Sequence, residues 1–225
     1  MNCAIVLAGG KSSRMGPNID KAFLNLESKP VLAHSLQVFQ DCADIDGIVL
    51  VARKDRLDAA RAMVQMFGIS KVQTVVGGGA ARQTSVYNGL TALDSSATIV
   101  AVHDGARPYV TPELVSKTIR CAKRYGSGVA AAKVTDTIKE VERGHVIKRT
   151  VDRERLWAVQ TPQTFKVSLL REAFARVRKK GAKVTDEASA VELLGKDVHI
   201  VPSTWVNVKI TTPDDLIPVA ALAKV

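Results

Sequence analysis

Short, continuously apolar runs alternate along this chain with longer segments of helical periodicity, and this alternation restricts the possible folds more than any other feature. The runs are rich in Val, Ile and Ala, lack the polar alternation of a half-exposed strand, and span residues 2–8, 47–52, 72–76, 98–103, 128–134 and 199–201. Such runs are typical of parallel strands that are buried on both faces. Between them, apolar residues recur at helical spacing, as Leu57, Ala60, Val64 and Phe67 do. We therefore expect an α/β fold: a doubly wound, mostly parallel Rossmann-like sheet with helices on both faces.

One segment does not follow this rhythm. Residues 137–151 (TIKEVERGHVIKRTV) alternate apolar with charged side chains around Arg143 and Gly144, which predicts a β-hairpin. A hairpin outside the sheet is marginal in water, so we expect it to pack on a partner surface. No linker, repeat or low-complexity stretch divides the chain, and we expect one domain over residues 1–225.

The composition excludes several classes of protein. Hydrophobic residues make up 46% and charged residues 24% of the 225, which is ordinary for a globular protein and unlike a disordered or fibrous one. The three cysteines lie far apart and form no C-x-x-C pair, so we expect a reducing compartment and neither disulfides nor a zinc site. The apolar opening run is too short for a signal peptide, and no run approaches the ~18 residues of a membrane span. We expect a soluble, cytoplasmic protein with no membrane partner.

The net charge of +10, from 32 basic and 22 acidic residues, favours an anionic partner. Nucleic acid is one such partner. Aromatic residues make up only 4% of the chain and do not interleave with the basic ones, which weakens any stacking platform for single strands. We therefore expect small anionic substrates and no nucleic acid.

Ligands of open α/β sheets bind beyond the carboxyl ends of the strands, so the residues that follow each apolar run are the candidates for a site. The first run leads into Ala8, Gly9 and Gly10, and then into a loop with Lys11 and Arg14. Glycines let backbone amides approach phosphate oxygens, and the basic side chains supply countercharge. The loop fits neither the Walker A motif nor G-x-G-x-x-G. A glycine turn with solvated charges explains it equally well.

Three later strand ends carry further candidates. Residues 77–79 are three glycines, which permit close approach to a base or ribose or form a flexible turn. The fourth run leads into Asp104 and Arg107. The carboxylate is a hard oxygen ligand for Mg²⁺, and the guanidinium suits a phosphate. The alternative is that the two residues form a surface ion pair. A strand over residues 205–210 carries Lys209, which we expect to face the site because a buried, unpaired lysine is costly.

This set of residues limits the chemistry. It contains no nucleophile–base pair and no metal-binding His/Cys cluster, and we expect His103 to be a packed residue and not a catalyst. What it offers is cations, glycine amides and one carboxylate. That combination suits phosphoryl or nucleotidyl transfer, where catalysis consists mostly of positioning and charge neutralisation.

Seven sequence blocks stand out and span nearly the whole chain: AGGKSSRMG, KAFL at 21–24, the glycines 78 and 79, HDGARP, VDRERLWAVQTPQTF at 151–165, TDEASAVE at 185–192 and NVKITTPDD at 207–215. Together they resemble the 2-C-methyl-D-erythritol 4-phosphate cytidylyltransferase family of the non-mevalonate isoprenoid pathway. The first block is shared in kind by many nucleotidyltransferases, whereas the 151–165 block with TDEAS and NVK is specific.

The resemblance implies transfer of CMP from CTP to methylerythritol phosphate, with release of pyrophosphate and a requirement for Mg²⁺. It implies catalytic roles for Arg14, Lys21 and Lys209, and a metal and phosphate role for Asp104. The implied CTP contacts are Ala8, Gly9, Gly10, Gly79, Ala80, Ser85, Asp104 and Gly105. The implied acceptor-binding residues are Arg107, Thr137, Arg153, Thr161 and Thr185.

The resemblance also implies how the chain is organised. Residues 1–225 would form a single nucleotidyltransferase domain, with a β-arm at about 133–156 that reaches over the active site of the partner in a homodimer. This arm coincides with the hairpin expected from the alternation of residues 137–151.

Two positions depart from the family pattern. Residues 8–12 read Ala-Gly-Gly-Lys-Ser where the family usually has Ala-Ala-Gly-x-Gly, which is closer to molybdenum-cofactor guanylyltransferases. Ala80 stands where the family usually has an aspartate. Ribitol 5-phosphate cytidylyltransferases share the first half of the pattern. A related nucleotidyltransferase with another base or acceptor is therefore the alternative function.

Overall fold

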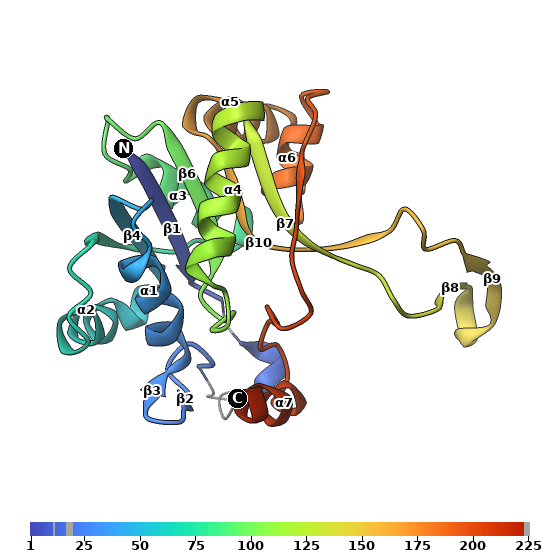
Figure 1. Ribbon diagram of the computed structural model, residues 1–225, viewed down its shortest axis with the longest axis horizontal. Helices are drawn as coiled ribbons and strands as arrows, with labels where there is room; N and C mark the ends of the chain where they lie inside the picture. Colours follow the sequence, from blue (N-terminus) through green and yellow to red (C-terminus); the bar gives the residue numbers. More distant parts are fainter. Residues whose placement is uncertain (11, 17–19, 223–225) are drawn as a thin grey trace.

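A seven-stranded sheet forms the centre of the computed structural model, which describes residues 1–10, 12–16 and 20–222 (Figure 1). The strand order is β11-β7-β10-β6-β1-β4-β5. Strand β10 runs antiparallel to both of its neighbours, and the other strands of this sheet run parallel to one another. The bounds are β1 Asn2–Ala8, β4 Gly47–Ala52, β5 Val72–Gly77, β6 Ile99–Asp104, β7 Ser127–Lys133, β10 Trp157–Lys166 and β11 Ile200–Pro202. The predicted doubly wound, mostly parallel sheet is confirmed.

Helices cover both faces of the sheet, because the strands are apolar along their length and successive side chains point to opposite sides. In β1, Ala4 and Val6 belong to one hydrophobic core while Cys3 and Ile5 belong to the other. The first core is shared with α1, α2 and α4, and α4 crosses in front of the sheet in Figure 1. The second core is shared with α3, α5 and α6. The helices span α1 Val31–Asp41, α2 Leu57–Met66, α3 Arg82–Thr91, α4 Pro112–Tyr125, α5 Val167–Lys180, α6 Glu187–Glu192 and α7 Leu216–Leu222.

Local signals set the ends of these helices. The hydroxyl of Thr111 accepts a hydrogen bond from the N–H of Leu114 at the start of α4 (3.2 Å). Gly181 follows α5 with a φ of 60°, in the left-handed region that favours glycine. A third, smaller core includes Leu26 of the short strand β2 (Asn25–Leu26), Val31 of α1 and Val219 of α7. The short strand β3 (Lys29–Pro30) pairs with β2.

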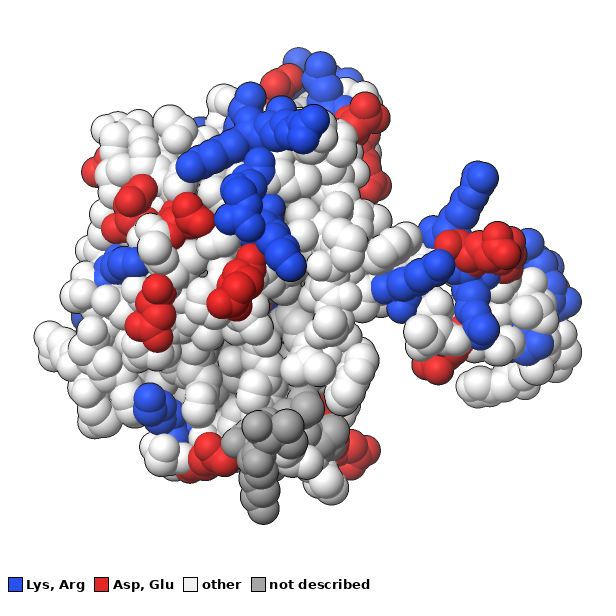
Figure 2. All heavy atoms as spheres, viewed as in Figure 1, with Lys and Arg blue, Asp and Glu red and all other residues white. Residues whose placement is uncertain are grey.

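The predicted hairpin is confirmed. Strands β8 (Ile138–Val141) and β9 (Ile147–Val151) pair antiparallel and extend well away from the body of the molecule (Figures 1 and 2). Their connection leaves the sheet where Lys133 pairs with Trp157. Val146 and Ile147 are 62% and 59% exposed, so the hairpin buries little apolar surface within this chain. We call residues 133–156 the arm.

Two strand predictions need correction. Residues 205–210 are not a strand: the backbone N–H of Ile210 donates to Ala106 in a loop (2.9 Å), and that of Val208 donates to Val206 (2.7 Å). Strand β10, which no apolar run predicted, fills the position between β6 and β7. Within the parts of the chain that the structure describes, no helix has both the length and the apolar character needed to cross a membrane.

Candidate nucleotide-binding and catalytic site

A cavity of about 880 Å³ opens at the carboxyl ends of β1, β4, β5 and β6. It is therefore at the edge of the sheet where the sequence placed the site. Its lining includes ten of the predicted site residues: Ala8, Gly9, Gly10, Arg14, Lys21, Gly79, Ala80, Ser85, Asp104 and Lys209. Cavities of this size accommodate a small-molecule ligand.

Glycines of two loops form one wall of the cavity. A Cβ atom at Gly78 would lie 3.3 Å from Cα of Gly9 and 3.0 Å from the Ser85 hydroxyl, so the close approach of the two backbones favours glycine at position 78. The Ser85 hydroxyl accepts a hydrogen bond from the N–H of Gly79 (3.0 Å). A Cβ atom at Gly10 would meet nothing within 4 Å, so this residue borders open space. The wall is flat backbone, which suits the face of a base or ribose.

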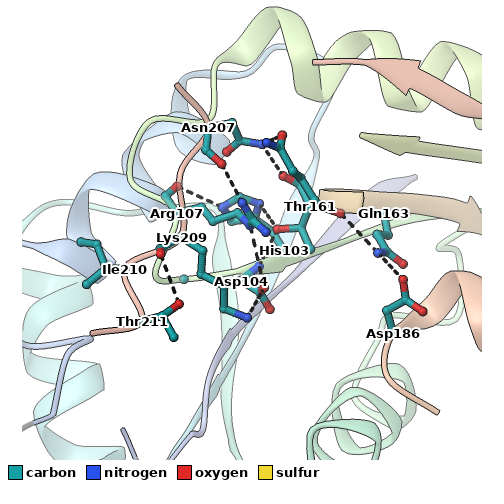
Figure 3. Close-up of polar contacts among 12 residues, drawn as sticks. His103, Asp104, Arg107, Thr161, Gln163, Asp186, Asn207, Lys209, Ile210 and Thr211 are labelled. Carbon is teal, nitrogen blue, oxygen red and sulfur yellow. Dashed lines mark hydrogen bonds and ion pairs between the residues drawn. The ribbon is translucent and has the colours of Figure 1, made fainter. Parts of the chain in front are cut away.

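Asp104 is the charged centre of the cavity floor. Its Oδ2 lies 2.7 Å from Nζ of Lys209 and 3.9 Å from Nε of Arg107, while its Oδ1 lies 3.2 Å from Nη2 of Arg82 (Figure 3 shows Asp104, Lys209 and Arg107). Burial alone would raise the pKa of this carboxyl, but Arg82 and Lys209 outweigh burial and hold the pKa below its usual range. Asp104 is therefore a carboxylate that fixes cations at the cavity floor.

Lys21 brings a second ammonium group to the same place. Its Nζ donates to the backbone oxygen of Ile210 (2.9 Å), next to Lys209 in the chain. Burial lowers the pKa of Lys21, and the nearby positive charges of Lys209 and Arg14 lower it further. Arg14 itself is exposed on the short helix at residues 13–15. The structure thus gathers the three predicted catalytic cations at one end of the cavity.

Ser12 accounts for one departure from the family pattern. Its φ of 53° and ψ of 27° lie in the left-handed region, where glycine is favoured. Its hydroxyl accepts a hydrogen bond from the N–H of Lys21 (3.3 Å). The serine therefore keeps the backbone shape of a glycine and adds a contact that links the loop to Lys21.

The segment that carries Lys209 is held by side chains and not by sheet pairing. The amide of Asn207 donates to Oε1 of Gln160 (3.0 Å) and to the backbone oxygen of Thr161 (2.8 Å), both in β10 (Figure 3). The backbone oxygen of Asn207 accepts from Nη1 of Arg107 (2.6 Å). The prediction that Lys209 faces the cavity is confirmed, although the strand predicted to carry it is absent.

His103 is packed, as predicted. It is fully buried, and its Nδ1 lies 3.1 Å from the hydroxyl of Thr161, which also accepts the N–H of Asp104 (3.0 Å). Burial lowers the pKa of His103 to about 3. A histidine of this kind is neutral at physiological pH, and its contact with Thr161 helps to fix the end of β6.

A sequence model of the 2-C-methyl-D-erythritol 4-phosphate cytidylyltransferase family (IspD) matches residues 2–224. The chain belongs to this family. The cytidylyltransferase of that name from Clostridium novyi is 42% identical over 216 residues, which cover 96% of this chain and 93% of that protein. Among solved structures, the Thermus thermophilus enzyme of the same name is 35% identical with a TM-score of 0.82, and each chain is covered to 98%. The 4-diphosphocytidyl-2C-methyl-D-erythritol synthase from Anaerococcus prevotii is 29% identical with a TM-score of 0.85, over 100% of this chain and 98% of that one.

The remaining residues that the cytidylyltransferase pattern predicts lie outside the cavity lining of this chain. Gly105, Arg107 and Thr161 are behind the floor: the N–H of Gly105 donates to the backbone of β1, and Arg107 and Thr161 are buried beside Asp104. Thr137 and Arg153 are on the arm, 3.4 Å apart at their closest polar atoms. Thr185 is exposed just before α6. Their substrate-binding roles stay predictions.

Two charged residues of this cytidylyltransferase were not among the predicted site residues. Arg82 lines the cavity and bonds Asp104, and Glu187 is a fully buried carboxylate behind it. Arg82 directly follows the glycine run, and Glu187 lies within TDEASAVE, so both belong to blocks that were recognised. Their 105-residue separation gave no signal that they pair.

Proposed function

We propose that this chain transfers CMP from CTP to 2-C-methyl-D-erythritol 4-phosphate, giving 4-diphosphocytidyl-2-C-methyl-D-erythritol and pyrophosphate. Family membership supports the activity. The observation that carries the mechanism is the pair of ammonium groups, Lys21 and Lys209, beside a carboxylate at the floor of a cavity with a glycine wall. The cytoplasmic location expected from the composition is part of this proposal.

The reaction requires charge neutralisation and no general base. A phosphomonoester has a second pKa near 6, so the acceptor is largely a dianion at neutral pH and is already a nucleophile. Its oxygen attacks the α-phosphorus of CTP, a new P–O bond forms, and the bond to the β-phosphate breaks to release pyrophosphate. Repulsion between the two anions opposes this approach, and Arg14, Lys21 and Lys209 stabilise the charge that develops.

Mg²⁺ fits the residues present. The part of the chain that the structure describes has no group of three or more His, Cys, Asp or Glu side chains suited to a metal ion. Mg²⁺ is usually held by one or two carboxylates together with substrate phosphates and waters. Asp104 supplies such a carboxylate in the cavity, and a lone pair of Oδ2 is left for the metal beside the ion pair with Lys209. When bound, the metal would neutralise part of the triphosphate charge. Removing divalent cations with a chelator should abolish turnover and adding Mg²⁺ should restore it.

A substrate panel tests the proposed function. We expect pyrophosphate release with CTP and methylerythritol phosphate, and little release when GTP, ATP or UTP replaces CTP or when ribitol 5-phosphate replaces the acceptor. A signal with GTP alone would overturn the choice of base, to which Ser12 and Ala80 are relevant. No release, together with tight and steeply salt-dependent binding of DNA or RNA, would favour a nucleic-acid binder.

We also propose that two copies form a C2 homodimer in which the arm of each completes the acceptor site of the other. Thr137 and Arg153 do not line the cavity of their own chain. The arm exposes Val141, Val146 and Ile147, which a second copy would bury. Both observations support an arm that serves its partner.

Mixing two inactive variants tests this arrangement. An Arg153→Ala chain and a Lys21→Ala chain should each be inactive alone and regain activity after subunit exchange, because one site of each heterodimer is assembled from intact halves. The mass in solution should be that of a dimer. A monomeric mass, or no recovery after verified exchange, would show that Arg153 serves its own chain.

A further inference from the structure

Arg82, the first residue of α3, bridges two carboxylates. Its Nε and Nη2 each lie 3.2 Å from Oδ1 of Asp104, and its Nη2 also lies 3.1 Å from Oε2 of Glu187. Nη1 bonds the other oxygen of Glu187. All three nitrogens of the guanidinium are thus engaged by the protein, in the forked geometry that arginine provides and lysine does not.

Glu187 is placed to hold Arg82 and to touch no substrate. It is 0% exposed, it does not line the cavity, and it is the first residue of α6. Gln163 of β10 fixes the start of that helix: its amide donates to Asp186 (2.9 Å, Figure 3) and its carbonyl accepts from the N–H of Ala188 (2.9 Å). A fully buried carboxylate is costly unless a charge pairs with it. In the described ranges, the cation that pairs with Glu187 is Arg82.

The geometry at Asp104 shows what this bridge does. Oδ1 is bound by Arg82 and Oδ2 by Lys209, so the position of the carboxylate determines where the Lys209 ammonium is held. The contacts with Glu187 add to those with Asp104, so they help to hold the Arg82 guanidinium beside Asp104 and away from a triphosphate in the cavity that both Arg82 and Lys209 line. Electrostatic catalysis depends on cations that are fixed before the reaction begins.

We propose that Arg82 and Glu187 are positioning residues for nucleotidyl transfer: Glu187 holds Arg82, Arg82 fixes Oδ1 of Asp104, and Asp104 thereby fixes the Lys209 ammonium at the reacting phosphates. This inference rests on the proposed function. It predicts that neutralising a buried carboxylate that does not line the cavity slows turnover more than it weakens CTP binding.

A neighbouring contact supplies a matched control. The side chain of Gln83 joins α3 to the loop just before α6, because its amide donates to Ala182 (3.3 Å) and its carbonyl accepts from Val184 (3.0 Å). It also keeps α3 attached to residues 182–184 when Glu187 is changed, so Glu187→Gln should fold. Gln83→Ala loosens this junction without contact with Asp104.

The experiment compares wild type, Glu187→Gln, Arg82→Lys, the double variant and Gln83→Ala by kcat, by KM for each substrate and by thermal unfolding. Wild-type turnover tests the proposed function, and the ratios to wild type test this inference. We expect kcat to fall about 10-fold or more in both single variants, as for a displaced cation, with KM for CTP changed less than about threefold. The double variant should be no slower than the slower single variant, because Glu187 acts through Arg82. Gln83→Ala should unfold at a lower temperature with kcat near wild type.

Three results would overturn the inference. Wild-type kcat in Glu187→Gln with only a lower unfolding temperature would make Glu187 structural. Losses that multiply in the double variant would show that Glu187 does not act through Arg82. A higher KM for CTP with unchanged kcat in Arg82→Lys would make Arg82 a nucleotide ligand.

Discussion

Replacing Lys209 by alanine separates catalysis from stability. The change removes the ammonium 2.7 Å from Oδ2 of Asp104, and with it one of the cations proposed to stabilise the transition state. Loss of one such group costs about 10²-fold in kcat, which corresponds to about 2.7 kcal/mol. A hydrogen bond to a charged group contributes about 1.5–3 kcal/mol to folding. The loss here should be smaller, because the Lys209 side chain is 33% exposed and Asp104 still forms its ion pair with Arg82 in the variant. We therefore expect a loss of only about 1 kcal/mol, or about 2–4 °C in Tm for a chain of this length.

The assay is pyrophosphate release at saturating CTP and acceptor, with thermal unfolding of the same preparations. Lys117→Ala is the control, because Lys117 is an exposed lysine on α4 outside the cavity lining. A Lys209→Ala protein with normal kcat would refute the role given to this ammonium. A drop in Tm much larger than that expected would mean that the cavity floor collapses without it.

Four further changes test the site from other directions. The native pKa of His103 is about 3 and that of an unfolded histidine is 6.5, so between these values only the unfolded state binds the proton and the unfolding free energy falls by about 1.4 kcal/mol for each pH unit downward. In urea unfolding from pH 6.5 to 4.5, the unfolding free energy of His103→Asn should depend less on pH than that of wild type. An unchanged pH dependence would contradict the buried, neutral imidazole. At Gly105 an added Cβ would lie 2.7 Å from a leucine side chain and 3.1 Å from a backbone oxygen, so Gly105→Ala should lose about 1–3 kcal/mol of unfolding free energy. Gly10→Ala should keep its stability and bind CTP more weakly in calorimetry, because its Cβ would occupy open cavity space; equal CTP affinity would remove Gly10 from the nucleotide site. Ser12→Gly removes the strain of a serine in the left-handed region but also removes its hydrogen bond to Lys21, so kcat should fall a few-fold while the unfolding free energy changes by less than about 1 kcal/mol. A faster enzyme would show that the serine contact does not contribute to catalysis.

The parallel strands and the hairpin of the arm were predictable because each depends on local patterns. Buried parallel strands require continuous apolar runs, and residues 137–151 alternate as a hairpin must. The position of the cavity followed from the rule that ligands bind at the carboxyl ends of strands. These features needed no knowledge of which distant residues touch.

The missed features depend on contacts between distant parts of the chain. Strand β10 contains Pro162 and polar residues, a pattern that argues against a central strand, and its pairing with β7 shifts register between Val159 and Gln163. Residues 205–210 were predicted to form a strand, but they are held by a backbone hydrogen bond to Ala106 and by hydrogen bonds of Asn207 to β10. The bridge from Asp104 through Arg82 to Glu187 joins three segments that no local pattern connects.

The antiparallel insertion of β10 also sets an order of assembly as the chain is made. Strands β1, β4, β5 and β6 are complete by residue 104 and can pair with one another, but β7 has no link to β6 until β10 is available to lie between them. Until then β6 presents an open edge, and the N–H of Asp104 lacks the hydroxyl of Thr161. The arm leaves the ribosome before the strand that closes its base, and the ammonium of Lys209 arrives later still. The contact between Asp104 and Lys209 at the cavity floor can therefore form only after residue 209 has been made, later than the glycine wall.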